Sequence, residues 1–363
     1  MHVAFFLESL DLGGIGRLTL RLAEGFAQKG YSVDLVLAKR QGDYLGQVPR
    51  QVNLIDLSSS RIVYSLPKLG AYLNRAKPGL LISAKERVNI IAILSKMIYK
   101  PDTRFIISIH VNHSEQIRHQ GASLYYRLIL KVARFLYSRA DNVVAVSGGV
   151  ATDASSLFKV PEKEIKVIYN PLVTPELKEK MQENAEHPWF EEEGLTIILG
   201  IGRLVRQKDF LTLINSFARV KEDRPEARLI ILGEGEQRKT MENKVAELGL
   251  EEFVDMPGYV ENPYSFLARS ALFVLSSAWE GFGNVLVEAM ATGTPVVSTD
   301  CPSGPGEILA GGKYGVLVPV GDPGLMAEGI NAALSQPVDR ALLQERAESF
   351  SVDRILKDYE SLF

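Results

Sequence analysis

The stretch SSAWEGFGNVLVEAMATGTPVVSTD, residues 276–300, carries the most information about the fold of this chain. An apolar strand ends at Ser276, a glycine-containing loop runs through 280–284, and a helical pattern begins near Asn284 and ends at Gly293. Glycines let the main chain approach a ligand closely, and the free N–H groups of a first helical turn attract a diphosphate. The stretch therefore predicts a strand, a loop that binds anions, and a helix.

Apolar runs alternate with helical patterns along the rest of the chain. The first half opens with an apolar run at 2–7, a glycine turn at 13–16, a helical pattern over 17–29 and a second apolar run at 31–38. Further strands are expected at 79–82, 105–110, 142–147 and 165–168 in the first half, and at 195–201, 228–232, 253–256, 272–275, 295–298 and 315–318 in the second. Such alternation is typical of parallel sheets covered by helices. The sequence predicts an α/β protein with two doubly wound, Rossmann-like sheets.

The length of 363 residues favours two domains. We expect an N-terminal domain over 1–170, a partly helical connection rich in Pro and Glu over 171–194, and a C-terminal domain over 195–350. Residues 351–363 have the spacing of an amphipathic helix, which we expect to pack back toward the N-terminal domain. Doubly wound sheets place ligands beyond the carboxyl ends of their strands, so a central cleft between facing domains is the expected site.

Composition excludes several classes of protein. Hydrophobic residues make up 46% and charged residues 23% of the chain, which is ordinary for a folded globular protein. The single cysteine, Cys301, has no partner for an intrachain disulfide, and no Cys/His spacing resembles a structural zinc site. The N-terminus lacks the pattern of a signal peptide, and no apolar stretch reaches the roughly 20 residues needed to span a bilayer. We expect a cytoplasmic protein with no nucleic acid among its partners.

Charge is distributed unevenly along the chain. Of the 41 Lys and Arg and the 44 Asp and Glu, residues 1–170 carry 23 and 13, which leaves 18 and 31 for residues 171–363. The positive first half predicts an anionic partner, either a phospholipid surface or a phosphate-bearing acceptor. The alternative is chance clustering of charges that serve solubility.

The segment 123–141, SLYYRLILKVARFLYSRAD, is basic, aromatic and of helical length. Apolar and basic residues recur in it at helical spacing, namely Leu124, Arg127, Leu128, Lys131, Arg134 and Phe135. Such a helix either faces the core with a cationic rim, which is the commoner arrangement, or lies on an anionic membrane. The second arrangement leaves open a peripheral contact with the inner face of the cytoplasmic membrane and a lipid-linked acceptor.

Two glutamates in the first stretch, Glu280 and Glu288, are separated by seven residues. This spacing resembles the E-x7-E signature of the retaining glycosyltransferases of family 4, which have the GT-B fold. The likeness extends over nearly the whole chain, through LGG at 12–14, VAVSGGV at 144–150, VIYNPL at 167–172, GIGRLVRQKDF at 200–210, ILGEGEQR at 231–238 and GYVENPY at 258–264. The run STDCPSGPGEIL at 298–309 is similar to the subgroup that builds lipopolysaccharide and lipid-linked oligosaccharides.

The resemblance implies four catalytic residues. Arg203 and Lys208 would neutralise the departing diphosphate in place of a metal ion, which agrees with the absence of an Asp-x-Asp pair from the sequence. Glu280 would hold the sugar. His110, at the end of the apolar run FIISIH, resembles the active-site histidine of the family, although His113 is a rival and either can be a structural residue. We expect neither a metal ion nor a cofactor.

The resemblance also implies a set of donor-binding residues. Glu288 would bind the ribose, and the main chain at Tyr259 and Val260 would bind the base. Glu234 resembles a residue near the nucleotide, but it can equally be a turn carboxylate. The glycine turn and the start of the helix in the first stretch complete the set with Gly14, Phe282, Gly283 and Asn284.

The glycine turn departs from two patterns. Gly14 to Thr19 comes close to the G-x-G-x-x-G of dinucleotide enzymes but has Thr19 in the third position, while the basic pair 39–40 could suit a 2′-phosphate. An NADP-dependent oxidoreductase is therefore an alternative. The turn also has Gly16 where the resembled subgroup has an acidic residue, so the contact of that acid is in doubt here.

Together these features predict a retaining hexosyltransferase. It would move a hexose or N-acetylhexosamine from a nucleotide-diphosphate sugar, with UDP favoured over GDP, to a hydroxyl of a glycan or lipid-linked acceptor. Two further alternatives remain: a nucleotide-sugar 2-epimerase of the same fold, and a non-catalytic protein that binds a nucleotide sugar or a lipid.

Overall fold

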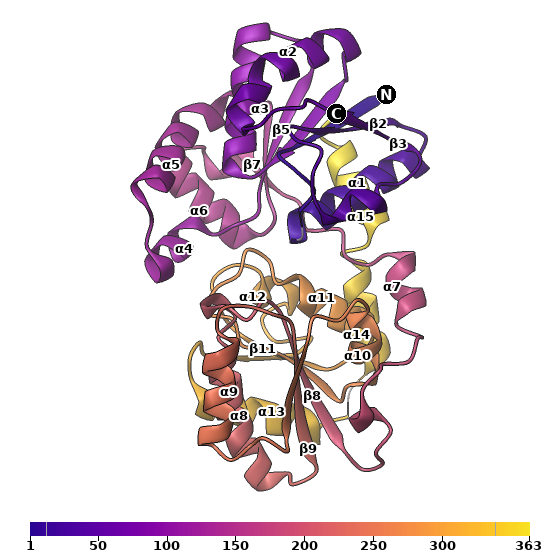
Figure 1. The fold of residues 1–363 in the computed structure, drawn as a ribbon, viewed down its shortest axis with the longest axis vertical. Helices are drawn as coiled ribbons and strands as arrows, with labels where there is room; N and C mark the ends of the chain where they lie inside the picture. The colour runs from indigo at the N-terminus through magenta and orange to yellow at the C-terminus, as the bar shows by residue number, and fades with distance from the viewer. Residues whose placement is uncertain (12, 338) are drawn as a thin grey trace. The chain divides into compact units, whose positions relative to one another are not determined.

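The computed structural model describes residues 1–11, 13–337 and 339–363 (Figure 1). Leu12, the first residue of the LGG motif, lies outside these ranges. The chain forms two compact units. Unit 1 consists of Met1–Pro171 and Val352–Phe363, and unit 2 consists of Leu172–Ser351.

Unit 1 is built on a seven-stranded sheet in the order β3-β2-β1-β4-β5-β6-β7. All of its neighbouring strands pair in parallel. The strands are β1 (His2–Leu7), β2 (Ser32–Leu37), β3 (Val52–Asp56), β4 (Leu80–Ala84), β5 (Arg104–Ile109), β6 (Asn142–Ala145) and β7 (Ile165–Val167). The central strands are buried along nearly their whole length, which explains why they are continuous apolar runs.

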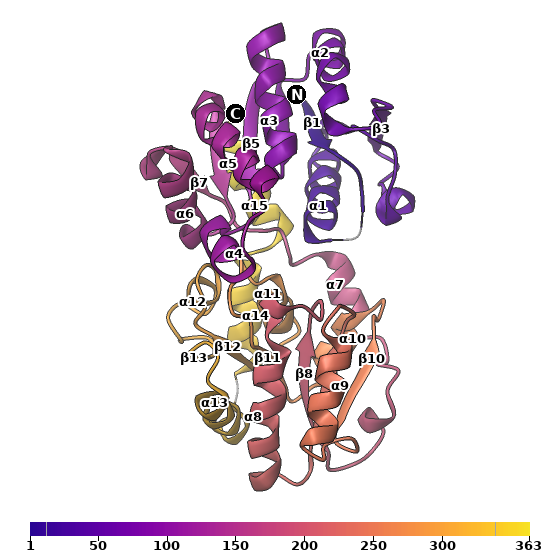
Figure 2. The same cartoon turned by 60° about the vertical axis from the view of Figure 1, so that its left-hand side comes forward.

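Helices cover both faces of this sheet (Figures 1 and 2). One side carries α2 (Ser65–Ala76), α3 (Glu86–Tyr99), α5 (Leu124–Leu136) and α6 (Gly148–Phe158), which pack in sequence against one another. The short α4 (His113–Gln120) contacts α6. On the other side α1 (Gly14–Gln28) packs against α15 (Val352–Glu360), the last helix of the chain.

The contact between α1 and α15 depends on a glycine in α1. A Cβ atom added to Gly25 would lie 2.6 Å from Leu356 and 2.8 Å from Val352. Lys29 of the adjoining turn forms an ion pair of 2.8 Å with Glu360. The C-terminal segment therefore belongs to the core of unit 1.

Unit 2 contains a six-stranded parallel sheet in the order β10-β9-β8-β11-β12-β13. Its strands are β8 (Thr196–Ile201), β9 (Ala227–Leu232), β10 (Val254–Gly258), β11 (Leu272–Leu275), β12 (Val296–Thr299) and β13 (Val316–Val318). Its helices are α7 (Pro175–Lys180), α8 (Phe210–Asp223), α9 (Arg238–Glu247), α10 (Pro263–Arg269), α11 (Asn284–Ala291), α12 (Pro305–Ile308), α13 (Pro323–Ser335) and α14 (Arg340–Glu348). One face is covered by α8, α9 and α13, and the other by α10, α11 and α14.

The predicted class, two doubly wound parallel sheets, is confirmed, and the differences are local. The edge strand β3 was not predicted, because VNLID over 52–56 mixes polar and apolar residues. Helix α1 begins at Gly14, three residues before the expected start at Arg17, because the glycines of the turn already adopt helical geometry. The expected connection over 171–194 is not separate, because Pro171 belongs to unit 1 and the chain from Leu172 onward belongs to unit 2.

Candidate active site

The strand order of unit 2 reverses between β8 and β11, its two central strands. Loops that leave adjacent strands at such a switch point run to opposite faces of the sheet, and the space between them is where ligands bind. The loop after β8 covers 202–209 and the loop after β11 covers 276–283. The sequence assigned Arg203, Lys208, Glu280 and Gly283 to the site, and the structure brings these two loops together.

Three hydrogen bonds join the loops. The Oγ of Ser276 donates to the main-chain oxygen of Lys208 at 2.7 Å, and the amide of Ala278 donates to the oxygen of Gln207 at 2.8 Å. The side-chain Nε2 of Gln207 donates in return to the oxygen of Trp279 at 2.9 Å. The two loops are therefore one rigid platform. Sequence reasoning missed Gln207, although it lies within the GIGRLVRQKDF motif.

Lys208 and Glu280 form an ion pair across this platform. The Nζ of Lys208 contacts Oε1 of Glu280, and the Oγ of Ser277 donates to the same oxygen at 2.7 Å. The side chains are only 15% and 9% exposed, so water screens the pair weakly. The pair orients both groups and leaves the second carboxylate oxygen of Glu280 outside these two contacts.

Arg203 is exposed on the same loop. Among the described residues no side chain pairs with its guanidinium. Close packing of glycines fixes the main chain of this loop, because a Cβ atom at Gly233 would lie 1.9 Å from the oxygen of Gly202, and one at Gly235 would lie 2.3 Å from the oxygen of Leu204. The GEG motif thus positions the loop that carries Arg203.

Glu234 lies between those two glycines and pairs with Arg238 at 2.8 Å. Its Oε1 would be 2.7 Å from a Cβ atom on Gly258, so the carboxylate rests against the end of β10. The next two residues, Tyr259 and Val260, are 65% exposed and partly exposed. The structure therefore places Glu234, Tyr259 and Val260 at one corner of unit 2, with the Glu234 carboxylate held by Arg238, the first residue of α9.

The start of α11 is also shaped by glycines. Gly283 precedes the helix with φ of 99°, and Asn284 is the first helical residue. Behind them, a Cβ atom on Gly304 would lie 1.8 Å from the oxygen of Phe282. The Phe282 ring is buried and makes an edge contact with Phe350 at 5.6 Å, so any contact with a donor would fall to its main chain.

Glu288 follows one turn inside α11 and is buried. The hydroxyl of Tyr264, which sequence reasoning did not single out, donates to its Oε1 at 3.4 Å. The two carboxylates of the E-x7-E spacing thus have separate partners, Lys208 for Glu280 and Tyr264 for Glu288. They lie on either side of the helix start, where the positive end of the helix dipole favours an anion.

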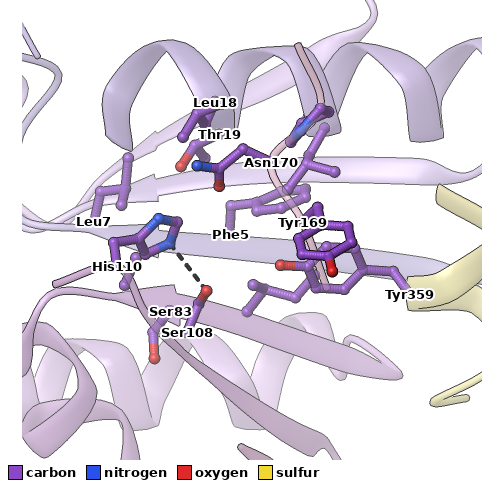
Figure 3. Close-up of a pocket in the computed structure, with 14 residues that line it drawn as sticks. Phe5, Leu7, Leu18, Thr19, Ser83, Ser108, His110, Tyr169, Asn170 and Tyr359 are labelled. Atoms are coloured by element: carbon purple, nitrogen blue, oxygen red, sulfur yellow. Dashed lines mark hydrogen bonds between the residues drawn. The ribbon is translucent and has the colours of Figure 1, made fainter. Parts of the chain in front are cut away.

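In unit 1, His110 follows the last residue of β5. Its Nε2 lies 2.9 Å from the Oγ of Ser108, and Figure 3 shows both beside a small pocket together with Thr19 and Asn170. The enclosed part of this pocket, about 20 Å³, admits one water-sized sphere. Burial lowers the pKa of His110 to about 4, with a further contribution from the charge of Lys85. The ring is therefore neutral at pH 7.

His113, the rival histidine, is buried in a polar cluster. Its Nδ1 lies 2.8 Å from the hydroxyl of Tyr126, its Nε2 lies 3.2 Å from Glu86, and its amide donates to Asp153 at 2.7 Å. Burial lowers the pKa of His113, while the two carboxylates act in the opposite direction. The His113 side chain is only 1% exposed and has polar partners on both ring nitrogens, which are the features of a structural residue.

The glycine turn of unit 1 has two distinct positions. Gly14 is the exposed first residue of α1. Gly16 is buried, and a Cβ atom there would lie 3.2 Å from the ring of Tyr44 and 3.3 Å from the oxygen of Asp11. An acidic side chain at position 16 would therefore have to extend past the Tyr44 ring.

In residues 1–11, 13–337 and 339–363, no three side chains among His, Cys, Asp and Glu are grouped so that they could hold a metal ion. Over the same residues, no helix combines the length and hydropathy of a membrane span.

Family models match both halves of the chain. The model described as "Glycosyltransferase Family 4" matches residues 12–174, and the model described as "Glycosyl transferases group 1" matches residues 181–350.

Curated relatives and solved structures agree with these matches. The chain is 28% identical to an N-acetylgalactosamine-N,N'-diacetylbacillosaminyl-diphospho-undecaprenol 4-alpha-N-acetylgalactosaminyltransferase of Campylobacter jejuni, over 98% of this chain and 97% of the other. It is 29% identical to the lipopolysaccharide core biosynthesis glycosyltransferase LpsE of Rhizobium meliloti, over 96% and 92%. Its fold is similar to that of HepE from Anabaena, solved with UDP (TM-score 0.81, 20% identity, 99% of each chain) and with UDP-glucose (TM-score 0.79, 21% identity, 100% and 99%).

Proposed function

The chain is a glycosyltransferase of family 4 with the GT-B fold, and from this premise we propose that it is a retaining hexosyltransferase that uses a UDP-sugar. The sugar is a hexose or N-acetylhexosamine. The acceptor is a hydroxyl of a glycan or lipid-linked intermediate in the synthesis of a cell-surface polysaccharide or glycolipid.

One observation in unit 2 carries the proposal. The Lys208–Glu280 pair is nearly buried on a platform of two hydrogen-bonded loops at the switch point of the sheet. A fixed cation and a fixed carboxylate suit the two halves of a nucleotide sugar, because the cation attracts the diphosphate and the carboxylate accepts hydrogen bonds from sugar hydroxyls. Arg203, exposed on the same loop, adds a second positive charge.

In the proposed reaction the bond between the anomeric carbon and the diphosphate breaks, and a bond to the acceptor oxygen forms on the same face of the sugar. The acceptor proton passes to the leaving phosphate. Lys208, Arg203 and the amides at Gly283 and Asn284 stabilise the negative charge that develops on the diphosphate. Glu280 holds the sugar. The two cations supply the charge that a divalent metal ion supplies in other transferases, so we propose that transfer needs no metal ion and no cofactor.

The remaining donor contacts follow from position. Glu288 accepts from the ribose, while the base lies at Tyr259 and Val260, beside Glu234. His110 in unit 1 is proposed to act as a neutral hydrogen-bonding group toward the sugar, because burial holds its pKa far below 7. Its role is orientation rather than proton transfer.

The names of two relatives and the positive charge of residues 1–170 support the proposed acceptor and the proposed location of the enzyme. The Campylobacter relative is named for a diphospho-undecaprenol substrate and LpsE for the lipopolysaccharide core. A lipid-linked acceptor would require this protein to work at the inner face of the cytoplasmic membrane, to which the positive charge of residues 1–170 is suited.

The test is transfer itself. The full chain is incubated with each UDP-hexose and UDP-N-acetylhexosamine, and with GDP-mannose, in the presence of EDTA and a panel of glycan and undecaprenyl-diphosphate acceptors. The proposal expects one UDP-sugar to be consumed with an acceptor, and the NMR coupling of the product to show the anomeric configuration of the donor. Conversion of a donor without any acceptor would instead establish the epimerase, and an inverted product or complete loss of activity in EDTA would contradict the mechanism.

A further inference from the structure

The outer face of α5 exposes an unusual number of large apolar side chains. Five of its thirteen residues are apolar, large and between 36% and 86% exposed, namely Leu124, Tyr125, Leu128, Val132 and Phe135. At about 100° per residue these five positions fall within an arc of about 100° on the helix surface. That width is typical of a face that packs against something.

This face is not the core face of the helix. Leu130, Ala133 and Leu136 are buried and hold α5 against its neighbours α3 and α6 (Figure 1). From the sequence, burial was expected as the commoner arrangement for the stripe of Leu124, Leu128 and Phe135. In the structure this stripe is exposed. The helix has two apolar faces, and only the inner one is covered within unit 1.

Cations border the exposed face. Arg127, Lys131 and Arg134 are exposed and lie on one side of the apolar arc, and Arg139 follows in the next turn. Residues 116–140 contain no Asp or Glu. Among the described residues none of these four side chains pairs with a carboxylate, and Arg127, Arg134 and Arg139 donate only to main-chain oxygens.

We propose that this face, called the α5 face and made of Leu124, Tyr125, Leu128, Val132 and Phe135 with the cations Arg127, Lys131, Arg134 and Arg139, docks on an anionic phospholipid surface. Apolar side chains would enter the boundary between head groups and acyl chains, and the cations would contact lipid phosphates. A second copy of the chain fits less well. A symmetric dimer through this face would bring four unpaired cations against four others, which is unfavourable.

Docking of the α5 face would fix the orientation of unit 1 on the lipid surface. The first turns of α5 lie beside the polar cluster of His113, since Tyr126 contacts that ring at 2.8 Å, and His113 is three residues from His110. The α5 face is thus close to the carboxyl edge of the unit 1 sheet. The suggestion that docking serves to present a lipid-linked acceptor rests on the proposed function. The docking itself requires neither donor nor acceptor.

The experiment measures co-sedimentation of the full chain with vesicles and without a donor. One set of vesicles is phosphatidylcholine, and the other is an equimolar mixture with phosphatidylglycerol. The triple variant L124Q/L128Q/F135Q is expected to bind the anionic vesicles more than about tenfold less well. The variant R127Q/K131Q is expected to lose about fivefold per cation, or about 25-fold in all, on anionic vesicles only. The control V63Q/Y64Q removes apolar side chains of similar exposure on another element and is expected to bind normally.

The outcomes separate docking from catalysis. All variants change exposed residues, and circular dichroism melting confirms that they fold. Wild-type protein that ignores anionic vesicles, or a triple variant that binds like wild type, overturns the proposal, as does a wild-type dimer in sedimentation velocity that the triple variant abolishes. Activity toward a water-soluble acceptor is expected to be the same in the triple variant, whereas absence of transfer with intact vesicle binding would count against the proposed function alone.

Discussion

At the carboxyl edge of the sheet in unit 2, contacts between two loops fix the charged residues that the sequence assigned to the site, whereas no such pair of charges fixes the assigned histidine of unit 1. In unit 2 the loops after β8 and β11 share three hydrogen bonds and the Lys208–Glu280 pair. In unit 1, among the described residues, the His110 ring has one hydrogen-bonding partner, Ser108, which lies near the end of β5 two residues earlier in the chain. The difference indicates that unit 2 holds a preformed charged site, whereas the residue assigned to the site in unit 1 is an uncharged ring at pH 7.

The largest effect is expected from breaking the charged pair. Lys208→Ala removes a cation from the platform and leaves Glu280 unpaired, so turnover should fall about 100- to 1,000-fold. The matched control is Lys239→Ala, which removes a lysine that is 81% exposed on α9 and should leave turnover unchanged. Near-normal steady-state turnover in Lys208→Ala would refute the proposed role of the pair.

The next effect concerns the glycine behind the helix start. Gly304→Ala places a Cβ atom 1.8 Å from the oxygen of Phe282 at a residue with φ of 98°, and should lower the free energy of unfolding by about 3 kcal/mol or more. Gly311→Ala also changes a glycine of positive φ, 66°, but has nothing within 4 Å of the added Cβ atom, and should cost only about 1 to 2 kcal/mol. Chemical denaturation compares the two. Equal losses would show that the close approach at Phe282 is unimportant.

A third substitution asks whether unit 1 can accept the acidic residue that the family resemblance implies at position 16. Gly16→Glu should lower the free energy of unfolding by about 1 to 3 kcal/mol and fail to raise turnover, because Tyr44 and the oxygen of Asp11 crowd the position. The double variant Gly16→Glu/Tyr44→Ala relieves one of these contacts. If Gly16→Glu proves as stable as wild type, Tyr44 does not exclude the acid.

The last prediction concerns a titration, whose effect on stability is confined to acid pH. The folded pKa of His110 is about 4 and the ordinary value is 6.5, so the folded chain should take up this proton only near pH 4, whereas the unfolded chain takes it up near pH 6.5. The free energy of unfolding should therefore fall as the pH falls from 6.5 to 4, because only the unfolded chain gains the proton in that range. Below pH 4 both states are protonated, and this group causes no further change. NMR of the ring, assigned with His110→Gln, should show no protonation at pH 6. A midpoint near 6.5 would contradict the burial of this ring.

The fold was predictable because the signals of doubly wound units are local. Continuous apolar runs such as that of β1 mark buried strands, and glycine-bounded helices mark the crossovers. The edge strand β3 was missed, since one of its faces meets solvent and its residues are mixed. The exact start of α1 was missed as well, because glycine gives no sign of helix in a sequence.

For the candidate site, the motifs indicated which residues would lie together, while their roles stay predictions. Lys208 and Glu280 are 72 positions apart, and the structure joins them directly. Supporting contacts were not predictable, since Gln207, Ser277 and Tyr264 carry no chemistry that marks them in a sequence. The exposure of the outer face of α5 was not predictable either, because helical spacing alone does not tell which of two apolar faces packs against the core.

The most direct test of the central claim, that unit 2 binds a nucleoside diphosphate through Lys208 without a metal ion, is the thermal midpoint of the full chain with UDP in EDTA. Ligand at about 100 times its dissociation constant adds roughly 2.7 kcal/mol to the free energy of unfolding. The account predicts a raised midpoint with UDP that EDTA does not change and that Lys208→Ala reduces. An unchanged midpoint with UDP, GDP and ADP, or a rise with NADP alone, would contradict it.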